Sequence, residues 1–381
     1  MRITLRAMVL SVLLGLGFTK SAFSQELNIV TTAVPFLRIS PDARSGGMGD
    51  VGIAISPDAN SSFWNLAKTP FATQRSGIGV TYTPWLKDIA QDVYLATIAG
   101  YHQIDEESAI SASIRYFNLG EIQFTDYSGS LTNIGRPREF SFDLGYSRKL
   151  SDYLSLGVAL RYINSSLANG AVSPGGITYK AGTGIAADLS IYHSGLNEDG
   201  QGFNYGISIS NLGTKIGYTN DAKSKDYIPA NLGVGMTYTW VLDETSKFSL
   251  ALDVNKSLVP APPINTDDNV QDSINLAEYR SQSVFSSWFK SFGNKAVTIS
   301  GGAEYTYNNQ FSIRAGYFYE GKDQGGRRYF TAGVGLKYNS VGLNFSYLAP
   351  SGNGITRNPL SNTLRFSVVF GLDGGDNSRG Y

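Results

Sequence analysis

Few side chains in this sequence could carry out acid–base, nucleophilic or metal chemistry. The 381 residues include two histidines, His102 and His193, and no cysteine, so a thiolate nucleophile and a disulfide framework are both excluded. A zinc site needs several nitrogen or sulfur ligands, which two histidines far apart in the chain do not supply. The adjacent carboxylates Asp267 and Asp268 could bind Ca²⁺, but nothing in their spacing requires it. The sequence therefore predicts no catalytic, metal-binding or cofactor-binding residue, and no enzyme.

A glycine-rich run, Gly46–Gly52, superficially suggests a phosphate-binding loop. It neither follows a predicted strand nor opens a βαβ unit, and it lacks the Lys-Ser/Thr pair of a P-loop. The run belongs instead to Arg38–Phe71, which has no sustained period-2 alternation and no long helical stripe. Its glycines, its two Ser-Pro-Asp triplets and Asn60 provide the chemistry of tight turns. A compact irregular segment just before a long run of strands predicts a hatch, or plug, at one end of a barrel.

We assign the hatch to an N-terminal segment, residues 25–76. Its predicted structural residues are Gly46, Gly47, Gly49, Asp50, Asp58, Asn60, Trp64 and Asn65. Before it, residues 1–24 have the pattern of a secretory signal peptide: Arg2 and Arg6 precede the apolar run Met8–Phe18, which is too short to span a bilayer. Without this signal the chain has 28 basic and 31 acidic residues, a net charge of −3, which argues against a nucleic-acid-binding protein.

The composition is that of a membrane barrel rather than a soluble domain. Only 16% of the residues are charged, against roughly 25% in a typical soluble domain, while glycine (43) and tyrosine (23) are abundant. After the expected signal peptide, no apolar run approaches the ~20 residues of a spanning helix. Low charge, many aromatic residues and short alternating segments together indicate a transmembrane β-barrel. A soluble β-sandwich would also explain the strands, but it accounts less well for the low charge and the strand lengths.

Fourteen candidate strands follow the hatch. In Tyr153–Ile163, for example, alternate residues are apolar, and the residues between them are Ser155, Gly157, Ala159 and Arg161. Because side chains alternate between the two faces of a strand, one face would meet lipid and the small or polar face would line the lumen. The predicted strands are 77–83, 92–101, 107–117, 138–149, 153–165, 178–192, 203–212, 229–240, 246–256, 295–306, 311–319, 329–338, 341–348 and 363–371.

The connections between these strands alternate in length. Tight turns such as Ser151-Asp152 and Asn339-Ser340 are expected at one end of the barrel. The longer connections at the other end are 118–137, 166–177, 213–228, 257–294 and 349–362. Short periplasmic turns and long outer loops are the rule for outer-membrane barrels. The predicted fold is therefore all-β: a fourteen-stranded antiparallel transmembrane barrel over 77–371 with an N-terminal hatch, both its ends on the periplasmic side, and a polar tail over 372–381.

Charged residues within the strands are expected to face the lumen, because each would cost about 2–4 kcal/mol on the lipid face near the midplane. Alternation places eight of them there, and we expect them to form interior ion pairs: Arg115, Arg161, Arg314, Arg365, Asp143, Asp188, Asp253 and Glu304. The same topology puts His102 and His193 in periplasmic connections. An esterase acting on outer-leaflet lipid would need its histidine at the opposite side, so both are interpreted as turn residues at the interface.

The longest connection, Ser257–Asn294, is a candidate surface for a protein partner. Structureless loops longer than ~12–15 residues are usually functional or disordered, and an apolar, aromatic loop on an outer surface can bind protein. The candidate contact residues are Pro260, Pro262, Pro263, Ile264, Phe285, Trp288 and Phe289. The alternative is that Trp288 and Phe289 belong to the aromatic girdle of the barrel, or that the end of the loop folds over the barrel mouth.

Two motifs in the predicted hatch resemble known families. Gly49–Ala54 followed by Asp58–Ala67 is similar to the hatch of the FadL superfamily, whose members carry a glycine/alanine stretch, an Asp-Ala and an Asn-Pro-Ala; here Leu66 replaces the proline. The run Phe36–Asp50, together with Ser56–Asn60, resembles more closely the PorV family, the FadL-like barrels of the type IX secretion system. The sister PorQ barrels share the hatch but are less similar to this run. Beyond the hatch the resemblance depends on strand number and length.

This resemblance implies a non-enzymatic barrel in the outer membrane of a Gram-negative bacterium. PorV-like proteins bind the giant translocon barrel, accept exported cargo through its C-terminal signal domain and deliver it to a cell-surface attachment complex. There a sortase-like partner cleaves the signal and couples the cargo to lipopolysaccharide. We expect the same partners here, with outer-membrane lipids around the barrel and no nucleic acid, and we assign translocon or cargo contact to Ser257–Asn294.

Two other functions fit the same fold. A FadL-like transporter of hydrophobic small molecules needs an apolar pocket and a lateral opening, often where a strand is kinked, and a strand containing Gly182 and Gly184 could kink in this way. Some accounts of PorV-like proteins add a link to lipid A deacylation, for which the placement of the histidines gives no support. The cargo distinguishes protein secretion from small-molecule transport: signal-domain proteins indicate the first, and hydrophobic molecules indicate the second. Leu66 and the PorV-like run favour protein secretion.

Overall fold

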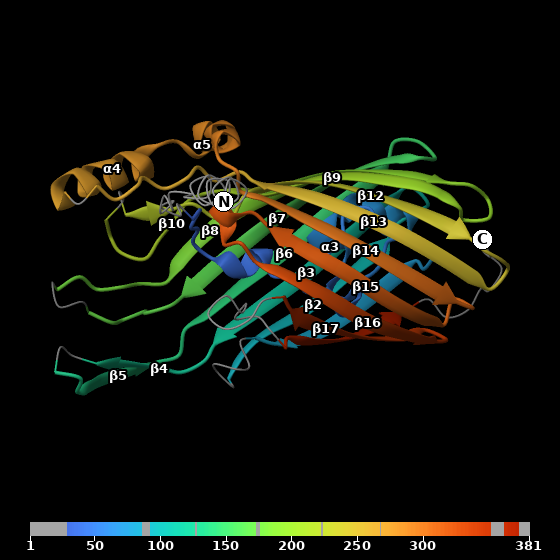
Figure 1. Ribbon diagram of the computed structural model, residues 1–381, viewed down its shortest axis with the longest axis horizontal. Coiled ribbons are helices and arrows are strands. Elements are labelled where there is room, and N and C mark those ends of the chain that lie inside the picture. The colour runs from blue at the N-terminus through green and yellow to red at the C-terminus, as the bar shows by residue number, and fades with distance from the viewer. Residues whose placement is uncertain are drawn as a thin grey trace, which may run out of the picture.

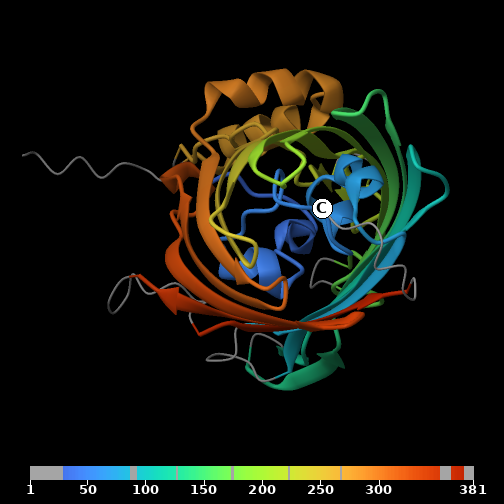
Figure 2. The same cartoon turned by 90° about the vertical axis from the view of Figure 1, so that its right-hand side faces the viewer.

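Fourteen strands close into one antiparallel barrel, seen from the side in Figure 1 and along its length in Figure 2. This computed structural model describes residues 29–85, 92–125, 128–172, 176–221, 224–266, 268–351 and 362–372. Strand β1 pairs with β18 and so closes the wall, which confirms the predicted fold. The wall strands are β1 (Ser76–Pro84), β2 (Val93–Gln103), β3 (Ser108–Leu119), β6 (Arg138–Lys149), β7 (Leu154–Ser166), β8 (Gly182–Leu196), β9 (Gly202–Gly213), β12 (Asn231–Val241), β13 (Ser246–Ser257), β14 (Val297–Tyr307), β15 (Phe311–Glu320), β16 (Arg328–Tyr338), β17 (Val341–Pro350) and β18 (Leu364–Gly371).

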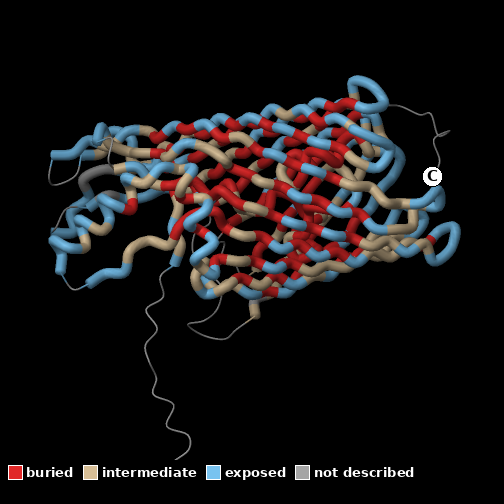
Figure 3. The backbone as a smooth tube through the Cα atoms, turned by 90° about the horizontal axis from the view of Figure 1, so that it is seen from above, coloured by how far each residue is buried: buried red, intermediate tan, exposed pale blue. Residues whose placement is uncertain are grey.

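Side chains along the strands alternate between a polar interior and an apolar exterior. In β7, Leu156, Val158 and Leu160 point outward and are 40–68% exposed, whereas Ser155 and Arg161 are buried. Figure 3 shows the same alternation around the wall as buried and exposed residues in turn. A closed wall whose exposed side chains are aliphatic and aromatic is suited to contact with lipid. None of the helices in the described part of the chain is long and apolar enough to cross a membrane.

The connections alternate in length, as the sequence predicts. Six turns of two to five residues join strands at one end, which we call the turn end, and the longer connections gather at the opposite, loop end. In two of these turns asparagines are left-handed: Asn308 and Asn309 share one turn with φ of 53° and 52°, and Asn339 in another has φ of 50°, a conformation that asparagine tolerates in tight turns. Both ends of the barrel lie at the turn end, where Gly77 pairs with Gly371. The expected signal peptide, Asp267 and residues 373–381 of the expected tail lie outside the described residues.

The loop end has regular structure that the sequence does not predict. Two small hairpins stand there, β4 (Ile122–Thr125) with β5 (Leu131–Gly135), and β10 (Ile216–Gly217) with β11 (Lys225–Asp226). The connection expected to be a structureless loop, 257–294, instead contains helices α4 (Asn269–Ser281) and α5 (Val284–Lys290), followed by the turn η3 (Ser291–Gly293). Asp268, considered above for Ca²⁺, caps α4 by accepting from two backbone N–H groups. A short η4 turn (Lys322–Gln324) joins β15 to β16.

Strand β8 differs from its prediction at both ends. It begins at Gly182 rather than at residue 178 and continues to Leu196. Its pairing with β7 is regular through Gly182 and Gly184, so the glycines do not kink it. The irregularity lies against β9, between Ala187 and Leu189, where the Asp188 carboxylate accepts the backbone N–H of Asn211 (2.7 Å) in place of a ladder bond.

Both histidines lie at the turn end, but within strands rather than in connections. His102 is in β2, opposite Ser76, and its Nδ1 is 2.8 Å from the serine hydroxyl. His193 is in β8 and lies between the rings of Tyr153 and Tyr205. The prediction of two turn residues is therefore wrong in detail, because the strands run further toward the turn end than the sequence indicates.

Candidate functional site

The segment from Val30 to Arg75 runs through the lumen from the loop end to the turn end. Val30 donates its N–H to the carbonyl of Asp323 at the loop end (2.8 Å), and the Arg75 carbonyl accepts from the N–H of Gln103 at the turn end (2.7 Å). Four short helical turns lie between them, drawn in blue inside the barrel in Figure 2: η1 (Pro35–Arg38), α2 (Ala43–Gly47), α3 (Ser61–Trp64) and η2 (Leu66–Phe71). We call residues 33–71 the hatch.

Glycines allow the hatch backbone to touch the wall. A Cβ on Gly47 in α2 would come 3.0 Å from the Cα of Gly333 on β16. The chain then turns at Gly49, whose φ of 74° strongly favours glycine. The backbone at Gly49 approaches β15 so closely that a Cβ on Gly316 would overlap it. The glycine-rich run is therefore a packing motif, in which glycines of the hatch face glycines of the wall.

Two ion pairs bind the hatch to the wall beside these glycines. The Asp50 carboxylate accepts from Arg365 Nη1 (2.9 Å) and from the hydroxyl of Tyr329 (2.6 Å). On the other side of α2, Arg44 donates to Glu304 (2.9 Å). The paired side chains are at most 15% exposed. Removing one partner of such a buried pair is strongly destabilising, because a charge is then left without compensation.

Hydrogen bonds to backbone atoms complete the docking. The Asp253 carboxylate on β13 accepts from the N–H groups of Gly52 (2.7 Å) and Ile53 (2.9 Å). From the hatch, Asn65 Nδ2 donates to the carbonyl of Ile191 on β8 (2.9 Å). These bonds satisfy polar groups of an irregular segment that would otherwise be buried without partners.

Within the hatch, the remaining predicted residues hold its turns together. The Trp64 indole donates to Asp42 (2.8 Å) and packs so closely on Gly52 that a Cβ there would overlap the ring. The Asp58 carboxylate accepts the N–H of Asn60 (2.8 Å). The structure places all eight residues named from the sequence in the hatch. The sequence treated Asp253 and Glu304 of the wall only as interior charges, without their hatch partners.

A second group of buried charges lies between the wall and η1. Arg161 donates to Asp143 and to Asp188 (2.8 Å), and Arg115 donates to Asp143 (3.3 Å) and to the carbonyl of Leu37 (3.2 Å). Together with the pairs made by Arg314 and Arg365, these contacts confirm the predicted interior ion pairs. Of the eight predicted charges, Asp253 differs, since it accepts backbone hydrogen bonds instead.

Replacing Arg161 by alanine should destabilise the barrel by about 3–5 kcal/mol, because two carboxylates would stay buried without their counter-ion. The matched change Arg148→Ala removes an exposed pair with Glu107 and should cost at most about 1 kcal/mol. Urea unfolding of the barrel refolded into lipid vesicles measures both free energies. Equal losses in the two variants would contradict a stabilising role for the buried group.

Apolar side chains fill the loop half of the lumen. Phe36 and Leu37 of η1 are 0% and 1% exposed, and they pack with Leu95, Phe117 and Ile163 of the wall. The rings of Phe36 and Phe117 stack at 6.3 Å. The side chains of the hatch thus occupy the apolar part of the lumen.

The hatch also carries one fully buried amine. Lys68 Nζ donates to the carbonyl of Gly52 (2.7 Å), and burial lowers the pKa of Lys68 to about 8 from 10.5. A released hatch exposed to water binds this proton up to a pH near 10.5, whereas the seated hatch loses it above about 8. The free energy of hatch docking should therefore become more favourable as pH rises through this window, by on the order of 3 kcal/mol over the whole of it.

Hydrogen–deuterium exchange of the hatch amides, corrected for the intrinsic effect of pH, measures this dependence on Lys68. Protection should increase between pH 8 and 10.5 in the wild type. The Lys68→Met variant should show a flat profile, because it has no proton to release. An identical pH dependence in both proteins would assign the effect to another group.

Helices α4 and α5 stand outside the barrel mouth at the loop end (Figure 1). Phe285 and Phe289 of α5 are 66% and 64% exposed, and Phe292 just beyond the helix is 59% exposed. The Phe285 ring contacts those of Trp288 (5.8 Å) and Phe289 (5.2 Å). We call these four residues the aromatic patch. The sequence analysis missed Phe292, which its helical spacing after Phe289 could have revealed.

The proline-rich start of this connection is less available for contact. Pro260 is buried, and its carbonyl accepts from the hydroxyl of Tyr279 (3.2 Å). Pro262 and Pro263 are half-buried, and Ile264 is 53% exposed. The residues predicted for partner contact therefore fall into two groups, a proline run that packs against the chain itself and an exposed helical end.

The aromatic patch is held in place by contacts on its N-terminal side. Lys215 Nζ donates to the carbonyls of Arg280 (2.7 Å) and Gln282 (2.6 Å), and Arg280 pairs with Asp226 (2.9 Å). Tyr227 donates its hydroxyl proton to the carbonyl of Tyr279 (3.1 Å). The segment is thus pre-organised before any partner arrives, which reduces the entropy lost on binding. Among the described residues, no group of three or more histidines and carboxylates is placed to hold a metal.

Comparison with known families decides what kind of barrel this is. A family model described as type IX secretion system protein PorV matches residues 22–264, which include the whole hatch. The chain belongs to the PorV family. The match ends before α4, so the aromatic patch of this PorV-family barrel lies beyond the matched residues. A search of curated proteins found no match.

Solved structures similar to this PorV-family barrel share its fold at low sequence identity. The toluene transporter TbuX of Ralstonia pickettii is 12% identical, with a TM-score of 0.54 over 87% of this chain and 98% of its own. The toluene transporter TodX of P. putida is 11% identical, with a TM-score of 0.52 over 88% and 99%. The PorV-family protein is thus a FadL-like barrel of the Gram-negative outer membrane. Because such barrels have short periplasmic turns and longer outer loops, we expect its turn end to face the periplasm.

Proposed function

We propose that this outer-membrane component of the type IX secretion system binds the translocon and cargo through its loop end rather than passing cargo through its lumen. The observation that carries the proposal is the aromatic patch, whose three phenylalanines are each 59–66% exposed on an anchored helical segment. Exposed aromatic clusters on a rigid support are typical of protein contacts, where they supply most of the binding free energy.

The closed lumen supports the same proposal. Wall and hatch are joined by buried ion pairs, by glycine contacts and by backbone hydrogen bonds, and η1 fills the apolar half of the lumen. A folded protein would need an open channel, so contact at the rim is the simpler route. In this proposal the barrel is not an enzyme. It delivers cargo bearing a C-terminal signal domain to a sortase-like attachment complex near lipopolysaccharide.

Photocrosslinking in living cells tests the proposal at single residues. A benzophenone amino acid at Phe289 should crosslink to a very large barrel or to secreted proteins that share a C-terminal domain. The same probe at Tyr338, which is 72% exposed at the turn end, serves as the control and should give neither product. Crosslinks to lipid alone at Phe289 would contradict the proposed contact.

Transport of hydrophobic molecules is the second candidate function. Its support is the shared fold with two proteins named as toluene transporters and the apolar cluster around Phe36. In this structure Phe36 and Leu37 of η1 occupy the centre of this apolar cluster, so transport would require η1 to leave it. Uptake of a labelled fatty acid by cells with and without the protein separates the two functions: secretion predicts equal rates, and transport predicts a faster rate with the protein.

A further inference from the structure

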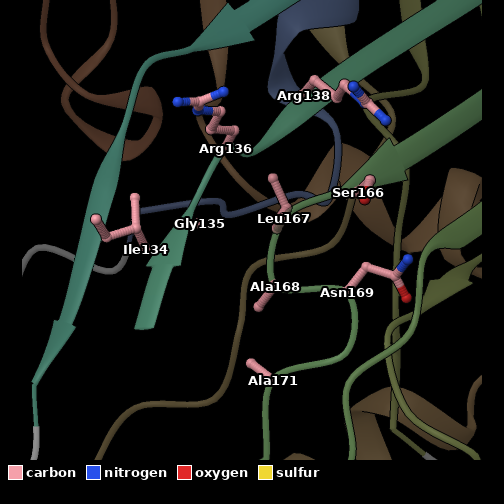
Figure 4. A pocket seen from close by; sticks show the side chains of 9 residues that line it. All are labelled: Ile134, Gly135, Arg136, Arg138, Ser166, Leu167, Ala168, Asn169 and Ala171. Carbon is pink, nitrogen blue, oxygen red and sulfur yellow. The ribbon is translucent and has the colours of Figure 1, made fainter. Parts of the chain in front are cut away.

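A crevice at the loop end lies between the start of β6 and the connection that follows β7. Its volume is about 280 Å³. Figure 4 shows Arg136 and Arg138 at one end of it and Ala171 at the other, with Ile134 and Leu167 along its sides. Basic and apolar side chains therefore line the same hollow. The crevice residues make none of the contacts described above between the hatch and the wall, and none of them belongs to the aromatic patch.

The charge in the crevice is poorly compensated. Arg136 has an acidic partner in Glu121 at 3.4 Å, but the two side chains are 80% and 42% exposed, so the pair contributes little. In the described part of the chain Arg138 has no acidic partner within ion-pair distance. Both arginines line the crevice, so an anion seated in it would lie near two positive charges. Guanidinium groups bind phosphate with paired hydrogen bonds.

The position of the crevice relative to the membrane identifies the source of the anion. Arg138 is exposed on the outer face of β6, two residues before Phe140. Phe140 and Tyr162 contact each other at 6.1 Å, and Tyr116 on β3 pairs opposite Phe140. Aromatic side chains of this kind mark the membrane interface of a barrel, so Arg138 lies just above it, at headgroup level. A lipid in the outer leaflet would reach the crevice directly.

We propose that this crevice binds a phosphate group in the headgroup of an outer-leaflet glycolipid. Arg136 and Arg138 hold the phosphate, and Ile134 and Leu167 contact the less polar part of the same molecule. The hollow is open and has an apolar side, which suits an amphipathic lipid better than a free inorganic ion. Bound lipid would fix the height of the barrel in the membrane and the orientation of the neighbouring β4–β5 hairpin.

Nanodiscs of phosphatidylcholine with a small fraction of bis-phosphorylated lipid A provide the test. Lipid A bound to the protein is counted by native mass spectrometry after release from the disc. The double variant Arg136→Gln/Arg138→Gln should bind lipid A at least about tenfold more weakly than the wild type. The control Arg75→Gln/Arg148→Gln removes two exposed charges at the turn end and should bind like the wild type.

Two further probes separate the sources of phosphate. Dephosphorylated lipid A should lose the Arg136/Arg138-dependent binding, and inorganic phosphate should compete only weakly. Equal lipid A binding by the wild type and the double variant would overturn the proposal. Inorganic phosphate that binds the crevice as tightly as lipid A would overturn the lipid assignment. Heat-modifiable migration in detergent gels checks that each variant is folded, and none of these readouts depends on secretion.

Discussion

The triple substitution Phe285→Ser/Phe289→Ser/Phe292→Ser should abolish cargo release to the cell surface while leaving the barrel folded. Each ring is about 60% exposed, so its removal costs little in the free monomer. In a contact, buried aromatic anchors contribute about 2 kcal/mol or more each. The affinity for the partner should therefore fall by at least about 100-fold. Secreted protein at the cell surface, measured by quantitative immunoblotting, gives the functional result.

A matched variant on the neighbouring helix controls for the loss of exposed apolar surface. Val270 and Ile274 on α4 are 70% and 54% exposed but lie outside the aromatic patch. The double substitution Val270→Ser/Ile274→Ser should leave secretion unchanged. If the triple variant secretes cargo at the wild-type level, the aromatic patch is not the contact surface. Full loss in both variants would move the contact to the whole of α4 and α5.

Replacing Gly316 by valine should displace the hatch and open the barrel to ions. A Cβ at this position overlaps the hatch backbone at Gly49, which is followed directly by Asp50 and its ion pair with Arg365. A shift of the hatch backbone there should therefore strain this pair. Overpacking of this kind usually costs about 1–3 kcal/mol, and more where backbone is struck. Single-channel recordings in planar bilayers should show a silent wild type and a conducting variant.

Gly301 provides the control for the conductance experiment. It lies on the neighbouring strand β14, but a Cβ added there meets nothing within 4 Å. Gly301→Val should therefore remain silent, because it faces outward. A closed pore in Gly316→Val would show that the hatch can shift without unsealing the lumen. Conductance in Gly301→Val would show that the recordings do not report on hatch seating.

The fourteen wall strands could be predicted because two environments act on them everywhere. Lipid on one side and a filled, polar lumen on the other impose a period of two on residues such as Leu156, Val158 and Leu160. The loop end lacks this constraint, since both faces of its segments meet water or other loops. The α4–α5 helices and the β4–β5 hairpin were missed for that reason. The Asp188–Asn211 contact was missed because side-chain bonds that replace a ladder bond leave no periodic signal.

The hatch was predictable in composition but not in its docking. Gly49 and its neighbours indicate tight turns, but that Gly49 faces Gly316 depends on two segments far apart in the chain meeting inside the barrel. The partners of Asp253 were missed for the same reason. Among the predicted contact residues, Pro260 is buried, and its carbonyl accepts from the hydroxyl of Tyr279. Tyr279 belongs to α4, a helix within the connection that was expected to be a structureless loop.

The account depends most on the claim that this barrel works with protein partners. The most direct test is purification of the tagged protein from its native outer membrane in mild detergent, with the bound proteins identified by mass spectrometry. We predict a very large β-barrel and secreted proteins that share a C-terminal domain, lost in the variant of Phe285, Phe289 and Phe292. A barrel that emerges alone, carrying only lipid-like ligands, would contradict the account and favour a transporter of hydrophobic molecules.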